Sequence, residues 1–205
     1  VMSIGCGPST DLFALDYLKE KGLYKFDTLK FRGIDSAKEV WMHIHKQIKK
    51  YNENLYKANF YYEDITELID TIVKVKWVPD LIVFQYVFSD MEKHCPPDKL
   101  KSFISKIGSF INNDMDPNTY ILLNDINLST QYGGGREHFD TLLSQIDVAH
   151  YRQYHFQNNK YQSHYNYGIE YESNSLVLKN PSYLGDYSPY TSCSSAQLII
   201  KKVIE

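Results

Sequence analysis

The stretch VMSIGCGPSTDLF, Val1–Phe13, decides how the rest of the chain is interpreted. Its apolar start, Val1–Gly5, has the character of a buried strand, and a glycine-rich turn follows at once. Beyond the turn, apolar residues recur at helical spacing until Gly22 supplies a stop; they are Leu12, Phe13, Leu15 and Leu18. The predicted order is strand, glycine-rich turn, helix. Because the strand is already under way at Val1, we expect an upstream segment to be absent from this sequence.

The same alternation continues through the first two thirds of the chain. Further strands are expected at Thr28–Ile34, Asn59–Tyr62, Leu81–Phe84 and Tyr120–Leu123. Between them, apolar residues at helical spacing predict helices over residues 37–52, around residues 68–72 and over residues 98–111. The continuously apolar Leu81–Phe84 is typical of a central parallel strand that is buried on both faces. Strands that alternate with helices predict a right-handed, doubly wound α/β sheet.

The last third of the chain has a different pattern. A helix is expected from Glu137 to Ile146, and after it Tyr151–Phe156, Ser175–Leu178 and Gln197–Val203 have the pattern of strands without intervening helices. A parallel crossover needs a dozen or more residues, usually helical, so we expect these late strands to pair antiparallel. The sequence contains neither an internal repeat nor a linker, and we therefore expect one domain over residues 1–205.

Composition limits the possible environments and partners. The chain has 205 residues, of which 43% are hydrophobic and 23% charged, as in ordinary globular proteins. A net charge of -3 argues against binding to duplex nucleic acid. The three cysteines are far apart and form no CxxC pair, which favours a reducing cytoplasm over a disulfide framework. No apolar run is long enough for a membrane span, so we expect a cytoplasmic protein.

The chain is also rich in tyrosine near its end, because nine of its 18 tyrosines follow residue 150. Tyrosine combines a wide apolar surface with one polar tip, which suits a substrate-binding surface. The same rings could simply cover the edge of the sheet. Both interpretations stay open at this point.

The glycine-rich turn and two acidic residues together predict a nucleoside site. Ligands of open α/β sheets bind at the carboxyl ends of the strands, where Gly5 and Gly7 allow the backbone to approach a ligand closely. Asp35 ends the second strand and is positioned to accept hydrogen bonds from the two hydroxyls of a ribose. Asp64, through its side chain or through the neighbouring backbone of Ile65, could receive an adenine amino group.

These segments resemble the class I S-adenosylmethionine-dependent methyltransferases. The resemblance rests on VMSIGCGPSTD as the glycine-rich motif, FRGID as the acidic second strand, FYYEDI as the adenine motif and PDLIVFQYVF as the fourth strand, and it covers nearly the whole chain. It implies a three-layer, Rossmann-like, mostly parallel sheet with strand order 3-2-1-4-5-7-6. In that order, Ala196–Val203 is the late antiparallel strand.

The resemblance also implies S-adenosyl-L-methionine as the cofactor. The implied binding residues are Gly5, Cys6, Gly7, Pro8, Ser9, Asp35, Ser36, Asp64, Ile65, Gln85 and Tyr86. In the family's arrangement, the turn lines the methionine moiety, Asp35 the ribose, Asp64 and Ile65 the adenine, and Gln85 and Tyr86 the sulfonium and substrate side. The chain departs from the family's three-glycine pattern at Ser9, and Asp35 lies farther from the turn than is common.

The expected function is methyl transfer to a small molecule or to a protein side chain. Two alternatives remain: a catalytically inactive module that keeps the fold, and a nicotinamide-dependent oxidoreductase. The second is disfavoured because the dinucleotide fingerprint requires glycine where Thr10 stands. The sequence also lacks the Asn/Asp-Pro-Pro-Tyr tetrapeptide of enzymes that methylate amino groups of nucleic acids, since Phe84–Val87 occupies that place.

No catalytic residue is assigned from the sequence. The candidates near the strand ends are Tyr86, Asp90, His94, Asn124 and Asp125, although Asp90 could instead cap the following helix. His43 and His45 lie two apart on a predicted helix, so we interpret them as part of a solvated face. Gly133–Arg136 has the composition of a loop or of a lid hinge. No spacing of histidines or cysteines predicts a metal site.

Overall fold

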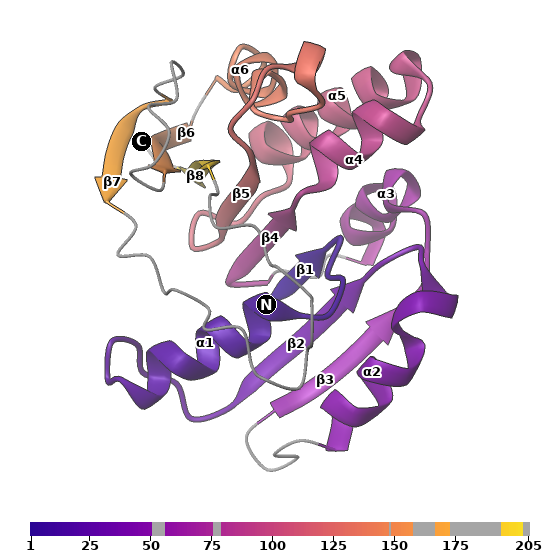
Figure 1. Cartoon of the computed structure of the whole chain (residues 1–205), viewed down its shortest axis with the longest axis vertical. Helices are drawn as coiled ribbons and strands as arrows, with labels where there is room; N and C mark the ends of the chain where they lie inside the picture. Colours follow the sequence, from indigo (N-terminus) through magenta and orange to yellow (C-terminus); the bar gives the residue numbers. More distant parts are fainter. Residues whose placement is uncertain (51–55, 76–78, 148, 158–166, 173–193, 203–205) are drawn as a thin grey trace, which may run out of the picture.

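A single mixed sheet organises the computed structural model, which describes residues 1–50, 56–75, 79–147, 149–157, 167–172 and 194–202. The strand order is β3-β2-β1-β4-β5-β8-β6-β7 (Figure 1). Five strands are parallel to one another: β1 (Met2–Ile4), β2 (Leu29–Ile34), β3 (Tyr56–Tyr61), β4 (Leu81–Gln85) and β5 (Tyr120–Ile126). β8 (Ser194–Lys202) lies antiparallel between β5 and β6 (Ala149–Gln157). The predicted order 3-2-1-4-5-7-6 is confirmed for β1 to β6 together with β8, which takes the place of the inserted seventh strand.

One strand at the edge of the sheet was not predicted from the sequence. β7 (Ile169–Glu172) forms the edge of the sheet beside β6 and pairs with it in parallel. The antiparallel pairing expected of the late strands is confirmed for β6 and β8, and β7 was not among the strands predicted. The strand predicted at Ser175–Leu178 lies outside the described residues. A strand as short as β7 has too few residues for a clear period-two pattern, which explains why the sequence did not indicate it.

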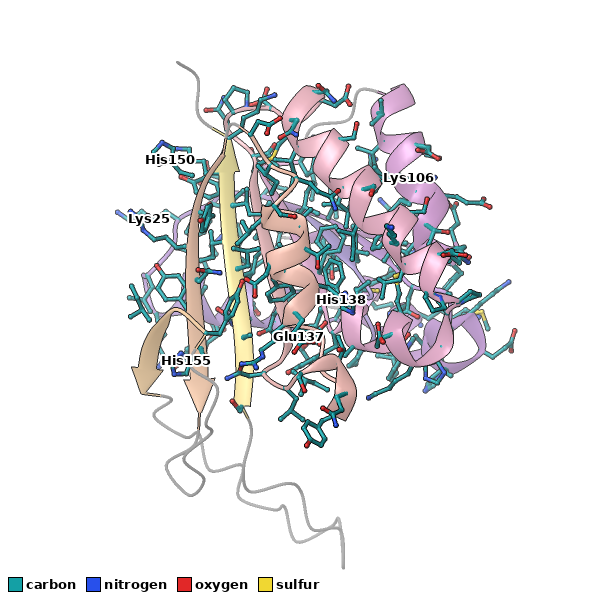
Figure 2. The ribbon with its side chains drawn as sticks, turned by 90° about the horizontal axis from the view of Figure 1, so that it is seen from above. Lys25, Lys106, Glu137, His138, His150 and His155 are labelled. Atoms are coloured by element: carbon teal, nitrogen blue, oxygen red, sulfur yellow. The ribbon has the colours of Figure 1, made fainter. Side chains whose placement is uncertain are left out.

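Two groups of helices cover opposite faces of the sheet. α1 (Thr10–Glu20) and α2 (Lys38–Lys50) pack on one face, where Leu12, Phe31 and Ile48 form a buried cluster. α3 (Ile65–Val75), α5 (Pro97–Asn113) and α6 (Glu137–Leu143) pack on the other face. In Figure 2, Lys106 of α5 and His138 of α6 lie on the same side of β6 and β8. None of the helices in the described part of the chain is long and apolar enough to cross a membrane.

The larger core lies between the sheet and the second helix group. Alternate strand residues point into it, as the period of two in a strand requires; they include Met2, Ile4, Ile82, Phe84, Ile121, Leu123, Leu198 and Ile200. α5 contributes Leu100, Phe103, Ile104, Ile107 and Ile111 at helical spacing, and each is at most 3% exposed. This layer holds β1, β4 and β5 in register and so fixes the strand ends that carry the candidate site.

A short helix, α4 (Val87–His94), follows β4 directly and was not predicted as a separate element. The Asp125 carboxylate at the end of β5 accepts hydrogen bonds from the backbone N–H groups of Phe88 (3.0 Å) and Ser89 (3.1 Å). These N–H groups belong to the first turn of α4 and have no partner within the helix itself. Asp125 therefore caps α4 and ties it to β5.

Candidate functional site

A cavity of about 600 Å³ opens at the carboxyl ends of β1, β2 and β4, and its size is within the range of small-molecule sites. Its wall combines the glycine-rich turn, the segment after β2, the start of α3, the segment after β4, one side of α4 along its length and the start of α5. Of the residues predicted from the sequence, Gly5, Cys6, Gly7, Pro8, Asp35, Ser36, Asp64, Ile65, Gln85 and Tyr86 line this cavity. The fold thus brings together segments that are far apart in the sequence.

Ser9 is the exception among the predicted residues. It has no exposed surface and does not belong to the cavity wall, so the structure does not place it with the rest of the turn along the cavity. Its backbone is left-handed, with φ 63°, and it stands at the N-cap position of α1. The chain turns here from strand to helix, and the tight reversal directs the Ser9 side chain into the protein.

The backbone conformation requires glycine at both positions of the turn, and at Gly5 a close approach requires it as well. Both have positive φ, 65° at Gly5 and 46° at Gly7, which is a costly backbone conformation for residues with a side chain. A Cβ atom at Gly5 would also lie 2.8 Å from the Val87 side chain and 3.1 Å from the Gln85 carbonyl oxygen. Gly5 therefore lets the turn after β1 approach the turn after β4, and both turns line the cavity.

Asp35 connects the glycine-rich turn to the start of α2. One carboxylate oxygen accepts a hydrogen bond from the Gly7 N–H (2.9 Å), and the other accepts one from the Ala37 N–H (2.8 Å). Each carboxylate oxygen can accept more than one hydrogen bond, so acceptor capacity remains for a ligand in the cavity. Asp35 holds the turn in place and still offers a negative charge to the cavity.

Asp64 is more fully occupied by the protein than Asp35. Its Oδ1 accepts hydrogen bonds from the Thr66 N–H and Thr66 hydroxyl, and its Oδ2 forms a 2.6 Å ion pair with the Lys99 ammonium group. The Lys99 hydrogen bond is the main reason that the pKa of Asp64 is lowered to about 2. Asp64 thus caps α3 and joins it to α5, which leaves the backbone of Ile65 as the freer recognition group at this wall.

Cys6 lies in the turn but has the character of a structural thiol. It is 3% exposed, and burial, with a smaller contribution from the charge of Asp35, raises its pKa to about 12. A thiol with so high a pKa remains protonated at neutral pH and is a weak nucleophile. The Cys6 position therefore offers packing and backbone contacts rather than covalent chemistry.

The candidate catalytic residues divide into two groups. Tyr86, Asp90 and His94 line the cavity, whereas Asn124 and Asp125 do not. Asp90 and His94 are exposed and 3.7 Å apart, beyond ordinary hydrogen-bond length. The capping role considered for Asp90 is performed by Asp125. Within the described ranges, no group of three His, Cys, Asp or Glu side chains could hold a metal ion.

Two important residues of the site, Trp41 and His45, were not identified from the sequence. The Trp41 ring lines the cavity beside Gly7. His45 is 2% exposed, so the interpretation of both α2 histidines as a solvated face holds for His43 but was wrong for His45. The spacing of Trp41, His45 and Ile48 at i, i+4 and i+7 places them on one helix face, and this signal could have indicated the burial of His45.

We expect His45 to make the stability of the protein dependent on pH. Burial lowers its pKa below the usual 6.5, so the folded protein favours the neutral ring. The unfolded chain then binds more protons as the pH falls below 6.5, and the stability contributed by neutral His45 is lost. The titratable and charged groups around the ring are Cys6, Asp35, His43, Lys49 and Tyr62.

Urea unfolding of the wild type and of His45→Gln checks this expectation. The difference in free energy of unfolding between the two proteins should shrink between about pH 7.5 and about pH 5.5. A difference that stays constant, or grows on acidification, would contradict a neutral buried His45.

Comparisons with known proteins identify the fold. The sequence matches no model of a known protein family, and it matches no curated protein. Among solved structures, the chain is similar to precorrin-6y C5,15-methyltransferase from Geobacter metallireducens GS-15, with a TM-score of 0.51, 12% identity and coverage of 98% of this chain and 79% of that one. It is also similar to a provisionally named rRNA-methylase from Clostridium thermocellum, with a TM-score of 0.52, 12% identity and coverage of 100% and 87%. With the observed strand order, these similarities show a class I methyltransferase fold.

Proposed function

We propose that the protein is an S-adenosylmethionine-dependent methyltransferase that binds its cofactor in the cavity at the strand ends. One observation carries the proposal: the glycine-rich turn, the Asp35 carboxylate and the backbone at Ile65 line a single cavity of about 600 Å³. The methyl acceptor is a small molecule or a protein side chain that approaches from the Tyr86 side. The charge of the whole chain, -3, supports such an acceptor over duplex nucleic acid.

The residues of the cavity fit the parts of the cofactor. The Asp35 carboxylate lines the cavity with acceptor capacity to spare, which suits the two hydroxyls of a ribose. The backbone at Ile65 suits the adenine edge, since the oxygens of Asp64 already bind Thr66 and Lys99. Gly5 and Gly7 leave room for the methionine part, and Gln85 and Tyr86 line the side toward the acceptor.

The cofactor supplies an activated methyl group on a positively charged sulfur, and the work of the protein is mainly orientation. Correct orientation of two reactants can lower a barrier by about 7 to 11 kcal/mol in favourable model reactions. A general base is needed only when the acceptor arrives protonated with a high pKa. For such an acceptor, His94 and Asp90 are the available ionisable side chains on the α4 wall of the cavity.

Calorimetric titration with S-adenosylhomocysteine, with NAD as the control, tests the binding step. We expect S-adenosylhomocysteine to bind and NAD to give no heat. Binding of NAD alone would favour an oxidoreductase, and absence of binding by either compound would contradict the proposed cofactor.

Trp41 provides an independent optical test of the same site. Because its ring lines the cavity beside Gly7, ligand binding should change its fluorescence, and S-adenosylhomocysteine should produce a saturable change. Trp41→Phe should abolish the signal while keeping an aromatic wall. The second tryptophan, Trp77, lies outside the described residues, and a signal that survives in Trp41→Phe would place the ligand elsewhere.

Turnover requires a separate measurement. The protein is incubated with S-adenosylmethionine and with small-molecule or protein fractions of a cell extract, and release of S-adenosylhomocysteine is measured. Release that depends on one fraction supports an enzyme and identifies the class of acceptor. Binding without release in any fraction would instead assign a non-catalytic module of the same fold.

A further inference from the structure

We propose that His45 is the positioning residue that fixes the glycine-rich turn in its binding geometry, by donating a hydrogen bond to the carbonyl oxygen of Gly7. This inference rests on the proposed function for its consequence, which is ligand affinity. Its physical content, the control of the turn, can be measured without any ligand.

Both ring nitrogens of His45 and one face of its ring have a defined contact. Nε2 lies 2.8 Å from the Gly7 carbonyl oxygen, and Nδ1 lies 3.0 Å from the Tyr62 hydroxyl. The face of the ring stacks on Phe60, with ring centroids 3.9 Å apart and planes inclined by only 5°. A buried ring with both nitrogens engaged and one face stacked has a single orientation.

These contacts also determine which nitrogen carries the proton. A carbonyl oxygen can only accept, so Nε2 must be the donor to Gly7. In the neutral ring that burial favours, Nδ1 is then the acceptor, and the Tyr62 hydroxyl donates to it. The chain of donation runs from Tyr62 through His45 to Gly7.

Both backbone polar groups of Gly7 are consequently held by hydrogen bonds. Its N–H donates to Asp35 at the end of β2, while its carbonyl oxygen accepts from His45 on α2. Both partners lie outside the turn, so the left-handed conformation of Gly7 is imposed by its surroundings rather than by local bonds alone. The sequence indicated Asp35 as a residue of the site, and the structure adds His45 as the second residue that holds Gly7.

The space for this arrangement comes from Gly33 on β2. A Cβ atom at Gly33 would lie 2.7 Å from the Phe60 ring and 2.9 Å from the Cys6 sulfur. Phe60 can therefore lie flat over the strand and present its face to His45. The ring of His45 is thus supported by packing while its nitrogens bind Gly7 and Tyr62.

A purely structural role for His45 makes a different prediction, and two substitutions separate the roles. His45→Gln retains a side-chain N–H that can reach the Gly7 oxygen, whereas His45→Leu has similar bulk and no donor. Both variants lose the stacking on Phe60. His43→Leu, two residues away on the exposed face, is the matched control.

The experiment combines amide hydrogen exchange of residues 5–9 with titration by S-adenosylhomocysteine. His45→Leu should exchange faster in the turn and bind about 5- to 20-fold more weakly, because it leaves the Gly7 carbonyl without its donor. His45→Gln should stay within about threefold of the wild type in affinity. His43→Leu should match the wild type in both measurements. Nitrogen NMR of the wild type should show the Nε2–H tautomer of His45.

The outcomes test the positioning role of His45 separately from the proposed cofactor. Equal exchange and equal affinity in His45→Leu and His45→Gln, or an Nδ1–H tautomer, would overturn the positioning role. If the wild type does not bind S-adenosylhomocysteine but His45→Leu alone loosens the turn, the proposed cofactor fails and the positioning role stands.

Discussion

Replacement of Asp35 by alanine is expected to weaken binding of S-adenosylhomocysteine by about 10- to 150-fold, the equivalent of roughly 1.5 to 3 kcal/mol for hydrogen bonds to a charged group. Two effects act together. The variant loses the acceptor for the ribose hydroxyls, and it also releases the Gly7 N–H and the Ala37 N–H that the carboxylate holds at 2.9 and 2.8 Å. Calorimetric titration gives the affinity directly.

The control for this experiment is Asp27→Ala, which removes an exposed carboxylate just before β2. It should bind as the wild type does. Asp35→Asn refines the result, because an amide retains one acceptor oxygen and should bind more tightly than Asp35→Ala. Unchanged affinity in Asp35→Ala would remove the ribose assignment.

Replacement of Phe103 by alanine is expected to have the largest effect on stability, about 3 to 5 kcal/mol in the free energy of unfolding. Phe103 has no exposed surface, and its ring lies 6.3 Å from that of Phe84 and 6.2 Å from that of Phe88, measured between centroids. Truncation loses the burial of the ring and leaves a cavity where α5 meets β4 and α4. Urea unfolding followed by circular dichroism measures the change.

The matched substitution is Phe13→Ala on α1, where the ring is 43% exposed. It should cost clearly less, because much of that ring already contacts water. Similar losses in the two variants would contradict the assignment of Phe103 to the core. The Phe103 ring contacts the Phe84 ring, and Phe84 directly precedes Gln85 of the cavity wall. Ligand affinity should therefore fall together with stability.

Much of the fold could be predicted because its signals are local in the sequence. The apolar run of β4, the helical spacing of α5 and the glycine-rich turn each depend on neighbouring residues, and the predicted strand order follows from them through the family resemblance. α4 and β7 were missed because each is too short to show a period. Their existence depends on tertiary contacts, such as the capping of α4 by Asp125.

The site was predictable where a residue's position along a strand determines its location. Asp35 directly follows β2, so its proximity to the turn after β1 follows from the pairing of adjacent parallel strands. The burial of Ser9 depends instead on the direction in which a tight turn points its side chain, and the burial of His45 depends on which face of α2 it occupies. Neither property follows from a position along a strand. The ligand roles of the remaining predicted residues stay predictions that the titrations test.

The position of Ser9 has a consequence for recognising distant relatives of this chain. Its left-handed backbone favours glycine, and its complete burial makes a larger side chain costly, because extra atoms in a packed interior displace their neighbours. Phe13 and Tyr17, which are 43% and 53% exposed on the following helix, carry no such restriction. In homologous sequences, substitutions should therefore be confined to small residues at position 9 and be frequent at positions 13 and 17.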